Sequence, residues 1–219
     1  MIIVGICGGS GSGKSTFAER IRDGLSCSCE IMRLDCYYFD QGGKPFEERT
    51  KVNYDSPEIF DFDEMLEDIR LLLDGKPVTR KGYNYAEHRR DDSEELMYPP
   101  EVLIIEGIHV FYDDRICDIM NLKLFIKVDS DICLLRRIAR DMNERGRSLE
   151  SISEQYKATV KPMREKYIDK YIDKAYVVVM RGGMNEQALK TTISYLKSCV
   201  KEQRPAESEK NESDGNDSE

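Results

Sequence analysis

The residues whose types and spacing point most directly to chemistry lie near the start of the chain, where residues 8–15 read GGSGSGKS. This spacing fits G-x-x-x-x-G-K-[ST], a loop in which backbone N–H groups surround phosphate oxygens. Glycine allows such close approach because it has no Cβ. Lys14 supplies a positive charge for the β- and γ-phosphates, and the Ser15 hydroxyl suits Mg²⁺. The predicted nucleotide-binding residues are Gly8, Gly9, Ser10, Gly11, Ser12, Gly13, Lys14, Ser15 and Thr16.

Two acidic residues follow apolar runs and are candidates for the same site. Asp35 ends the predicted strand EIMRLD, and Glu106 follows the apolar run VLII. In an open parallel sheet, the carboxyl ends of the strands converge on the ligand. Asp35 is therefore a candidate base for a hydroxyl proton, although a turn or helix-capping aspartate explains its position equally well. Glu106 is a candidate Mg²⁺ ligand acting through water, and an ordinary strand-end acid is the alternative.

A basic stretch, RRIARDMNERGRS, occupies residues 136–148. The commoner explanation for such a run is a solvated face. In a chain of net charge -9 that also has a phosphate loop, a mobile lid over the transferring phosphoryl group is the competing hypothesis. Guanidinium groups there would neutralise charge and exclude water. The arginines concerned are Arg136, Arg137, Arg140, Arg145 and Arg147.

Strands and helices must position these candidate residues. Along the chain, short apolar runs alternate with helical patterns. Such alternation predicts an α/β fold with a parallel sheet and helices on both faces. The predicted strands are residues 1–7, 30–35, 101–107, 122–129 and 175–183. The predicted helices are residues 14–24, 60–75, 130–146 and 186–203.

Composition narrows the class of protein. The chain has 219 residues, of which 40% are hydrophobic, and its net charge is -9. An acidic balance argues against a protein whose main task is to bind nucleic acid. No apolar run approaches the length of a membrane span, and the first strand-like run begins at Ile2, which leaves no room for a leader. Seven scattered cysteines predict reduced thiols and a cytoplasmic protein.

Two segments break the alternation. Residues 76–100 are polar and irregular, and a connection of this length inside a compact domain is usually functional. Residues 204–219 hold almost nothing apolar and predict a disordered acidic tail, so that their removal would leave activity and stability nearly unchanged. The predicted folded domain is then residues 1–203.

The phosphate loop does not by itself identify the reaction. A GTPase normally also has an [NT]-K-x-D element, which the sequence lacks, and a motor ATPase usually needs a longer chain. A small-molecule kinase needs a second substrate pocket and a carboxylate that accepts a hydroxyl proton, as Asp35 could.

With these residues assembled, the chain resembles the uridine kinase family, also called uridine–cytidine kinases, over roughly residues 1–200. The stretches LDCYYFD, NYDSP, YNYAEHRR and RDMNERGRS are more specific than the phosphate loop. The related phosphoribulokinases share the loop but not this full set. The resemblance implies transfer of the γ-phosphoryl of ATP or GTP to the 5′-hydroxyl of uridine or cytidine in pyrimidine salvage. It also implies a nucleoside-monophosphate-kinase-like five-stranded sheet, a base-reading insert at 76–100, an arginine lid at 136–160 and a homotetramer.

The resemblance also assigns roles by position. Asp35 resembles the general base, Lys14 and Arg140 other catalytic groups, and Asp55 the acid that binds the ribose hydroxyls. The implied metal ligands are Ser15 and Glu106. The implied substrate-binding residues are Tyr38, Asp55, Tyr83, Tyr85, His88, Arg137, Arg145, Arg147 and Gln155.

The insert departs from the family pattern at two positions. The sequence reads RKGY where a proline-containing P-x-Y is expected before Tyr83, and Asn84 stands where aspartate is common. The base-reading hairpin could therefore sit differently, which leaves a kinase for a sugar phosphate or modified nucleoside as an alternative. A nucleotide-binding regulator without activity is a further alternative. His109 matches no motif residue and is expected to be satisfied or solvent-facing.

Overall fold

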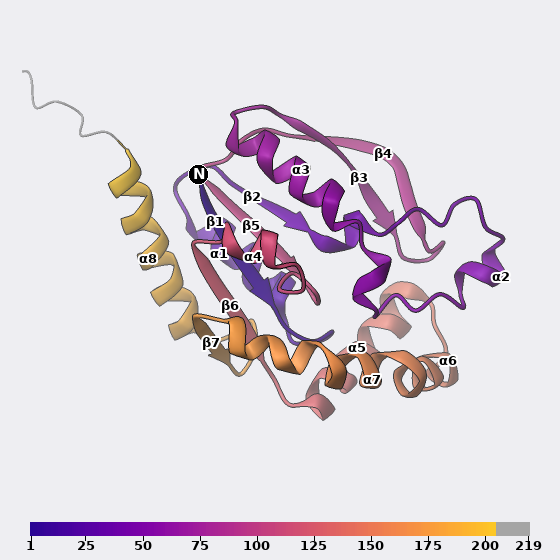
Figure 1. The fold of residues 1–219 in the computed structure, drawn as a ribbon. Coiled ribbons are helices and arrows are strands. Elements are labelled where there is room, and N and C mark those ends of the chain that lie inside the picture. Colours follow the sequence, from indigo (N-terminus) through magenta and orange to yellow (C-terminus); the bar gives the residue numbers. More distant parts are fainter. Residues whose placement is uncertain (205–219) are drawn as a thin grey trace, which may run out of the picture.

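The structure, a computed structural model, describes residues 1–204. Five parallel strands form one sheet in the order β2-β5-β1-β6-β7 (Figure 1). The predicted strands and the α/β class are confirmed. The strand bounds are β1 Ile2–Cys7, β2 Cys29–Arg33, β5 Val102–Gly107, β6 Leu122–Lys127 and β7 Val177–Met180.

The second strand ends earlier than the sequence predicted. β2 stops at Arg33, and Asp35 lies in the 3-10 helix η1, Leu34–Tyr37. The apolar run continues through Leu34, which is fully buried, so hydrophobicity alone hides the change of backbone conformation. Asp35 is nevertheless placed at the carboxyl end of β2, where ligands of parallel sheets bind.

The four predicted helices are confirmed as α1 Lys14–Gly24, α3 Phe62–Leu73, α5 Ser130–Arg145 and α8 Glu186–Gln203. α3 begins where the Asp61 side chain accepts a hydrogen bond from the Glu64 N–H. α5 ends at Gly146, which has a φ of 62°, a conformation that glycine adopts readily. The shorter helical segments are α2 Phe46–Arg49, η2 Pro57–Ile59, α4 Asp114–Asp118, α6 Leu149–Gln155, η3 Tyr156–Val160, α7 Lys161–Lys166 and η4 Ile168–Lys174.

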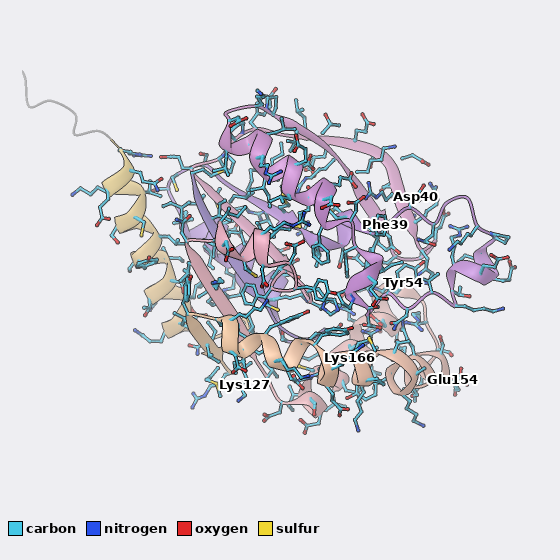
Figure 2. The ribbon with its side chains drawn as sticks, in the orientation of Figure 1. Phe39, Asp40, Tyr54, Lys127, Glu154 and Lys166 are labelled. Carbon is cyan, nitrogen blue, oxygen red and sulfur yellow. The ribbon has the colours of Figure 1, made fainter. Side chains whose placement is uncertain are left out.

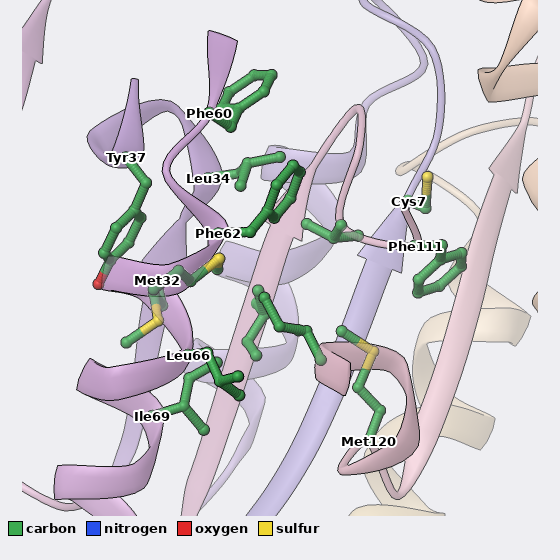
Figure 3. Packing of buried hydrophobic residues seen from close by; sticks show 14 of the residues in the cluster. Cys7, Met32, Leu34, Tyr37, Phe60, Phe62, Leu66, Ile69, Phe111 and Met120 are labelled. Atoms are coloured by element: carbon green, nitrogen blue, oxygen red, sulfur yellow. The ribbon is translucent and has the colours of Figure 1, made fainter. Parts of the chain in front are cut away.

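Apolar side chains bury both faces of the sheet in two separate clusters. Successive residues of a strand point to opposite faces, so in β1 Ile3 and Cys7 join one cluster while Val4 and Ile6 join the other. The first cluster lies under α3 and includes Leu66, Ile69 and Met120, as Figure 3 shows. The second lies under α1 and α8. Covering both faces in this way is typical of a parallel sheet.

The predicted irregular character of residues 76–100 was wrong, because an antiparallel hairpin of β3 Val78–Asn84 and β4 Arg89–Met97 fills this segment. Val78 pairs with Met97 and both are buried in the first cluster, which anchors one end of the hairpin. Most of its other side chains are polar. The pattern therefore lacked the apolar alternation that usually indicates a strand.

The last helix of the described residues, α8, runs along one side of the molecule beside β7 (Figure 1). Arg204 follows α8, and its Nε lies 2.9 Å from the Glu101 carboxylate. The rest of the predicted tail, residues 205–219, lies outside the described residues. Among residues 1–204, no helix is both long and apolar enough to cross a membrane. All seven cysteines lie within this range and are free thiols.

Candidate active site

The phosphate loop connects β1 to α1 and is shaped by glycines that no other residue could replace without strain. Gly11 and Gly13 have φ values of 83° and 89°. A Cβ on Gly11 would lie 2.3 Å from the Cys133 carbonyl oxygen, and one on Gly13 would lie 2.9 Å from the Gly183 nitrogen. Gly13 is also the residue that precedes α1, so the loop leads directly into a helix N-terminus, where free N–H groups and the helix dipole favour an anion.

Ser15 and Glu106 come together behind this loop. The Ser15 hydroxyl donates a hydrogen bond of 2.9 Å to Glu106 Oε1. Burial raises the pKa of Glu106, and the positive charge of Lys14 opposes that shift. Residues 1–204 contain no group of three or more side chains that could hold a metal by themselves. A hydroxyl beside one carboxylate instead fits Mg²⁺, which usually binds through one or two protein oxygens together with phosphates and water.

Asp35, the predicted general base, lines the pocket described below, and a tyrosine of the hairpin contacts it. The Tyr85 hydroxyl donates a hydrogen bond of 2.6 Å to Asp35 Oδ2. The guanidinium of Arg145 lies 4.0 Å from the centre of the Tyr85 ring. The hairpin, the end of β2 and the end of α5 therefore meet at the carboxylate.

One pocket gathers all nine of the substrate-binding residues that the sequence predicted. It lies between the hairpin, the segment after α2 and the helices α5 and α6, and Tyr54, which is labelled in Figure 2, is one of the residues that line it. The lining residues are Ser10, Asp35, Tyr38, Tyr54, Asp55, Tyr83, Tyr85, His88, Ile108, Arg137, Arg140, Arg145, Arg147 and Gln155. Of these, Tyr54 and Ile108 were not predicted. Three of the other predicted site residues do not line this pocket and lie at or beside the phosphate loop instead: Lys14, Ser15 and Glu106.

Asp55 is a buried carboxylate on the wall of this pocket. Its Oδ2 accepts a hydrogen bond of 2.9 Å from the Thr159 hydroxyl, and Arg137 Nη1 lies 4.0 Å from Oδ1. Burial raises the pKa of Asp55, whereas Arg137 and the Thr159 hydrogen bond lower it. Thr159 was missed by the sequence because a lone threonine after α6 carries no distinguishing pattern.

The arginines of the predicted lid converge on a residue that sequence reasoning also missed, Asp141. Its side chain is fully buried. The arginine nitrogens lie 2.8 Å (Arg140), 3.4 Å (Arg137), 3.4 Å (Arg145) and 3.8 Å (Arg147) from its carboxylate oxygens. One negative charge among four positive ones leaves the cluster with an excess of positive charge. The i, i+4 spacing of Arg137 and Asp141 was the available signal.

Three further contacts involve the arginines of this cluster. Gln155 Oε1 accepts hydrogen bonds from Arg137, at 2.9 Å, and from Arg147. Arg140 Nη2 lies 3.4 Å from the Ser10 hydroxyl of the phosphate loop. The four arginines therefore line the pocket beside the phosphate loop, and their action as a lid stays a prediction.

The hairpin contributes aromatic side chains to the pocket. The ring centre of Tyr38 is 4.7 Å from that of Tyr83, and Tyr54 stacks on His88 at 5.0 Å. Burial lowers the pKa of His88, and the positive charges of Arg147 and Arg49 lower it further. His88 has a φ of 52°, which is unusual for a residue other than glycine and marks a constrained turn.

The hairpin departs from the family pattern at RKGY and at Asn84, yet its aromatic side chains still line the pocket. The Asn84 side-chain oxygen accepts hydrogen bonds from the N–H groups of Ala86, at 3.0 Å, and Glu87, at 3.1 Å. An aspartate could accept the same two bonds. Lys81 pairs with Glu94, and the register shifts between Lys81 and Tyr83, at Gly82. A glycine at such an irregularity is common in hairpins.

The strand–loop–helix unit, the buried acid beside it and the arginine-lined second pocket define a P-loop phosphotransferase. Residues 3–188 match the Phosphoribulokinase / Uridine kinase family, and the chain belongs to that family. It is 41% identical over 201 residues to a uridine kinase from Ligilactobacillus salivarius, an alignment that covers 91% of this chain and 94% of that protein. A uridine kinase from Streptococcus uberis is 44% identical, with 86% of this chain and 90% of that protein covered.

A solved structure agrees on the fold. Phosphoribulokinase from Rhodobacter spheroides superposes with a TM-score of 0.61 at 13% identity, and the superposition covers 82% of this chain and 69% of that one. The two chains therefore share their overall fold.

Proposed function

We propose that this protein is a uridine–cytidine kinase that transfers the γ-phosphoryl group of ATP, or of GTP, to the nucleoside 5′-hydroxyl. The observation that supports this most is the single pocket that holds Asp35, Asp55 and the hairpin aromatics beside the phosphate loop. The relatives described above are uridine kinases that align over most of their length. Nucleoside and nucleoside triphosphate are accordingly the small-molecule partners.

In the transfer step, the 5′-oxygen attacks the γ-phosphorus while the bond from that phosphorus to the β–γ bridging oxygen breaks. The proton of the hydroxyl passes to the Asp35 carboxylate, and ADP leaves with the bond electrons. Asp35 orients the hydroxyl before it accepts the proton. The N–H groups of the loop and Lys14 hold the β- and γ-phosphates. Mg²⁺, held through Ser15 and Glu106, would supply further charge neutralisation.

The pocket is suited to a ribonucleoside. The Asp55 carboxylate can accept hydrogen bonds from both ribose hydroxyls, with Arg137 and Tyr38 beside it. Tyr83 and Tyr85 offer aromatic faces to a flat base. A neutral His88 can donate or accept at the base edge, which would tolerate both the 4-oxo group of uracil and the 4-amino group of cytosine.

The arginines act after both substrates are bound. Arg140, Arg145 and Arg147 would neutralise the charge on the equatorial phosphoryl oxygens and exclude water, so that ATP is not hydrolysed. The segment 136–160 is the proposed lid, within a kinase domain of residues 1–203. A cytoplasmic homotetramer is proposed from the family resemblance.

The test is a panel of acceptors with purified protein and Mg-ATP, read by ADP release and by mass spectrometry of the product. We expect uridine and cytidine to give UMP and CMP, and the variant Lys14→Met to give neither. Turnover of a sugar phosphate or a modified nucleoside instead would favour another alcohol kinase. ATP binding without turnover of any acceptor would favour a regulator that has lost catalysis.

A further inference from the structure

His109 is a buried titratable residue that the proposed chemistry does not use. It lies two residues after β5 and its side chain is fully buried, so the expectation of a satisfied side chain holds and that of a solvent-facing one does not. It touches neither Asp35 nor the phosphate loop through any hydrogen bond of the described residues. Its contacts lead instead to Asp55.

Both ring nitrogens of His109 have partners. Nε2 lies 2.7 Å from the backbone carbonyl oxygen of Asp55, and Nδ1 lies 2.9 Å from the Tyr171 hydroxyl. A carbonyl oxygen only accepts, so Nε2 must carry the hydrogen. Burial lowers the pKa of His109 to about 4, which keeps the ring neutral at physiological pH. Nδ1 then accepts a hydrogen bond, and the Tyr171 hydroxyl of η4 donates it.

Aromatic rings fix the orientation of the imidazole. The ring centres of Phe60, Tyr112, Tyr167 and Tyr171 lie 5.9 Å, 6.4 Å, 5.8 Å and 5.8 Å from that of His109, all in edge-to-face arrangements. Such a cage leaves little room for the ring to rotate. The donor at Nε2 is consequently held at a fixed place relative to the sheet and to η4.

The backbone of Asp55 depends on this donor because it belongs to no helix or strand. Its N–H donates to the Asn53 side-chain oxygen at 3.1 Å, and its carbonyl accepts from His109. We infer that His109 is a positioning residue: through the Asp55 carbonyl and Tyr171, it fixes the carboxylate that receives the ribose hydroxyls. This inference rests on the proposed role of Asp55.

Two substitutions separate the two hydrogen bonds of the imidazole. In His109→Asn, the amide can reach only the place of Nδ1, so the contact with Tyr171 survives and the donor to Asp55 is lost. In His109→Gln, the longer side chain brings an amide donor to the place of Nε2. We expect the Asn variant to raise KM for uridine at least fivefold and to reduce the preference for uridine over 2′-deoxyuridine. The Gln variant should restore KM to within about twofold of the unmodified enzyme, and KM for ATP should change less than twofold in both.

The stability control is Leu196→Ala, which truncates a fully buried side chain in the cluster on the other face of the sheet. It should lower Tm without changing KM for uridine. An unchanged KM in the Asn variant overturns the inference, and so does an equal rise for uridine and ATP or an equal rise in the Leu196 variant. If the unmodified protein neither binds nor phosphorylates uridine, the proposed function fails first, and the role of His109 fails with it.

Discussion

The phosphate loop and the nucleoside pocket are built in different ways. The loop uses consecutive residues, 8–15, between one strand and one helix, and its shape follows from local backbone conformation. The pocket takes side chains from η1, from the segment after α2, from the hairpin turn and from α5 and α6. None of these segments belongs to the five-stranded sheet.

Because of this difference, the phosphate loop depends little on the rest of the molecule, whereas the nucleoside pocket depends on contacts between distant segments. A loop that depends on its own glycines works wherever a strand and a helix support it, and a phosphate-binding loop therefore recurs in proteins with many reactions. A pocket assembled from distant segments needs groups that hold the segments together. In this protein those groups are buried and polar: Asp141 holds the arginines, and His109 holds the Asp55 backbone.

The largest expected effect on activity comes from a change at Asp35, whose carboxylate lines the nucleoside pocket together with Ser10 of the phosphate loop. Asp35→Asn keeps the shape of the side chain but cannot accept a proton at neutral pH. We expect kcat to fall by about 10²–10⁴-fold, towards the lower half of that range because positioning contributes much of phosphoryl transfer. Steady-state kinetics with uridine and calorimetry with ATP provide the measurement.

The control for this variant is Asp40→Asn, which changes an exposed carboxylate five residues further along the chain. It should leave kcat within about twofold. A loss of less than about fivefold in the Asp35 variant, with ATP binding retained, would identify Asp35 as a turn residue.

Asp141→Asn tests whether the pocket depends on its hidden carboxylate. Removing one partner of a buried ion-pair cluster costs about 3–5 kcal/mol, which lowers Tm by roughly 6–20 °C for a chain of this size. Displaced arginines should also reduce kcat/KM by about 10–100-fold. Asp114→Asn is the matched control, since Asp114 is exposed and pairs with Lys174 at 2.6 Å. Its cost should stay below about 1 kcal/mol, and equal costs in the two variants would contradict the account.

A smaller effect concerns the pH dependence of stability. The unfolded chain titrates His109 at its ordinary pKa of 6.5, whereas the folded protein titrates it at about 4. Between these values the unfolded state binds the extra proton, so the free energy of unfolding falls as the pH falls. The contribution between pH 7 and pH 5 is about 2 kcal/mol. Urea unfolding followed by circular dichroism should show this slope diminished in His109→Gln; an identical slope in both proteins would show that His109 does not titrate this way.

Much of the fold was predictable because its strands and helices have strong hydrophobic patterns. The hairpin was not, since Val78 and Met97 are its only buried hydrophobic residues and most of its other side chains are polar. The end of β2 was misplaced by two residues because Leu34 continues the apolar run.

Within the site, the sequence could indicate residues whose type is tied to a motif, but not residues that act through another residue. The motifs identified Asp35, Asp55 and Arg140, and the structure brings all three to one pocket. Asp141 was not selected and His109 was assigned no role, because their importance depends on which side chains surround them. Nothing in the spacing of Asp55 and His109 indicates that the two are hydrogen-bonded.

The most direct test of the division between the two regions is calorimetry on Asp55→Asn with each substrate separately. The variant leaves the ribose hydroxyls incompletely paired, at a cost of about 1–3 kcal/mol, or roughly a 5–150-fold rise in Kd for uridine. Kd for ATP should stay within twofold because the phosphate loop is untouched. An unchanged affinity for uridine, or an equal loss for uridine and ATP, would contradict the account.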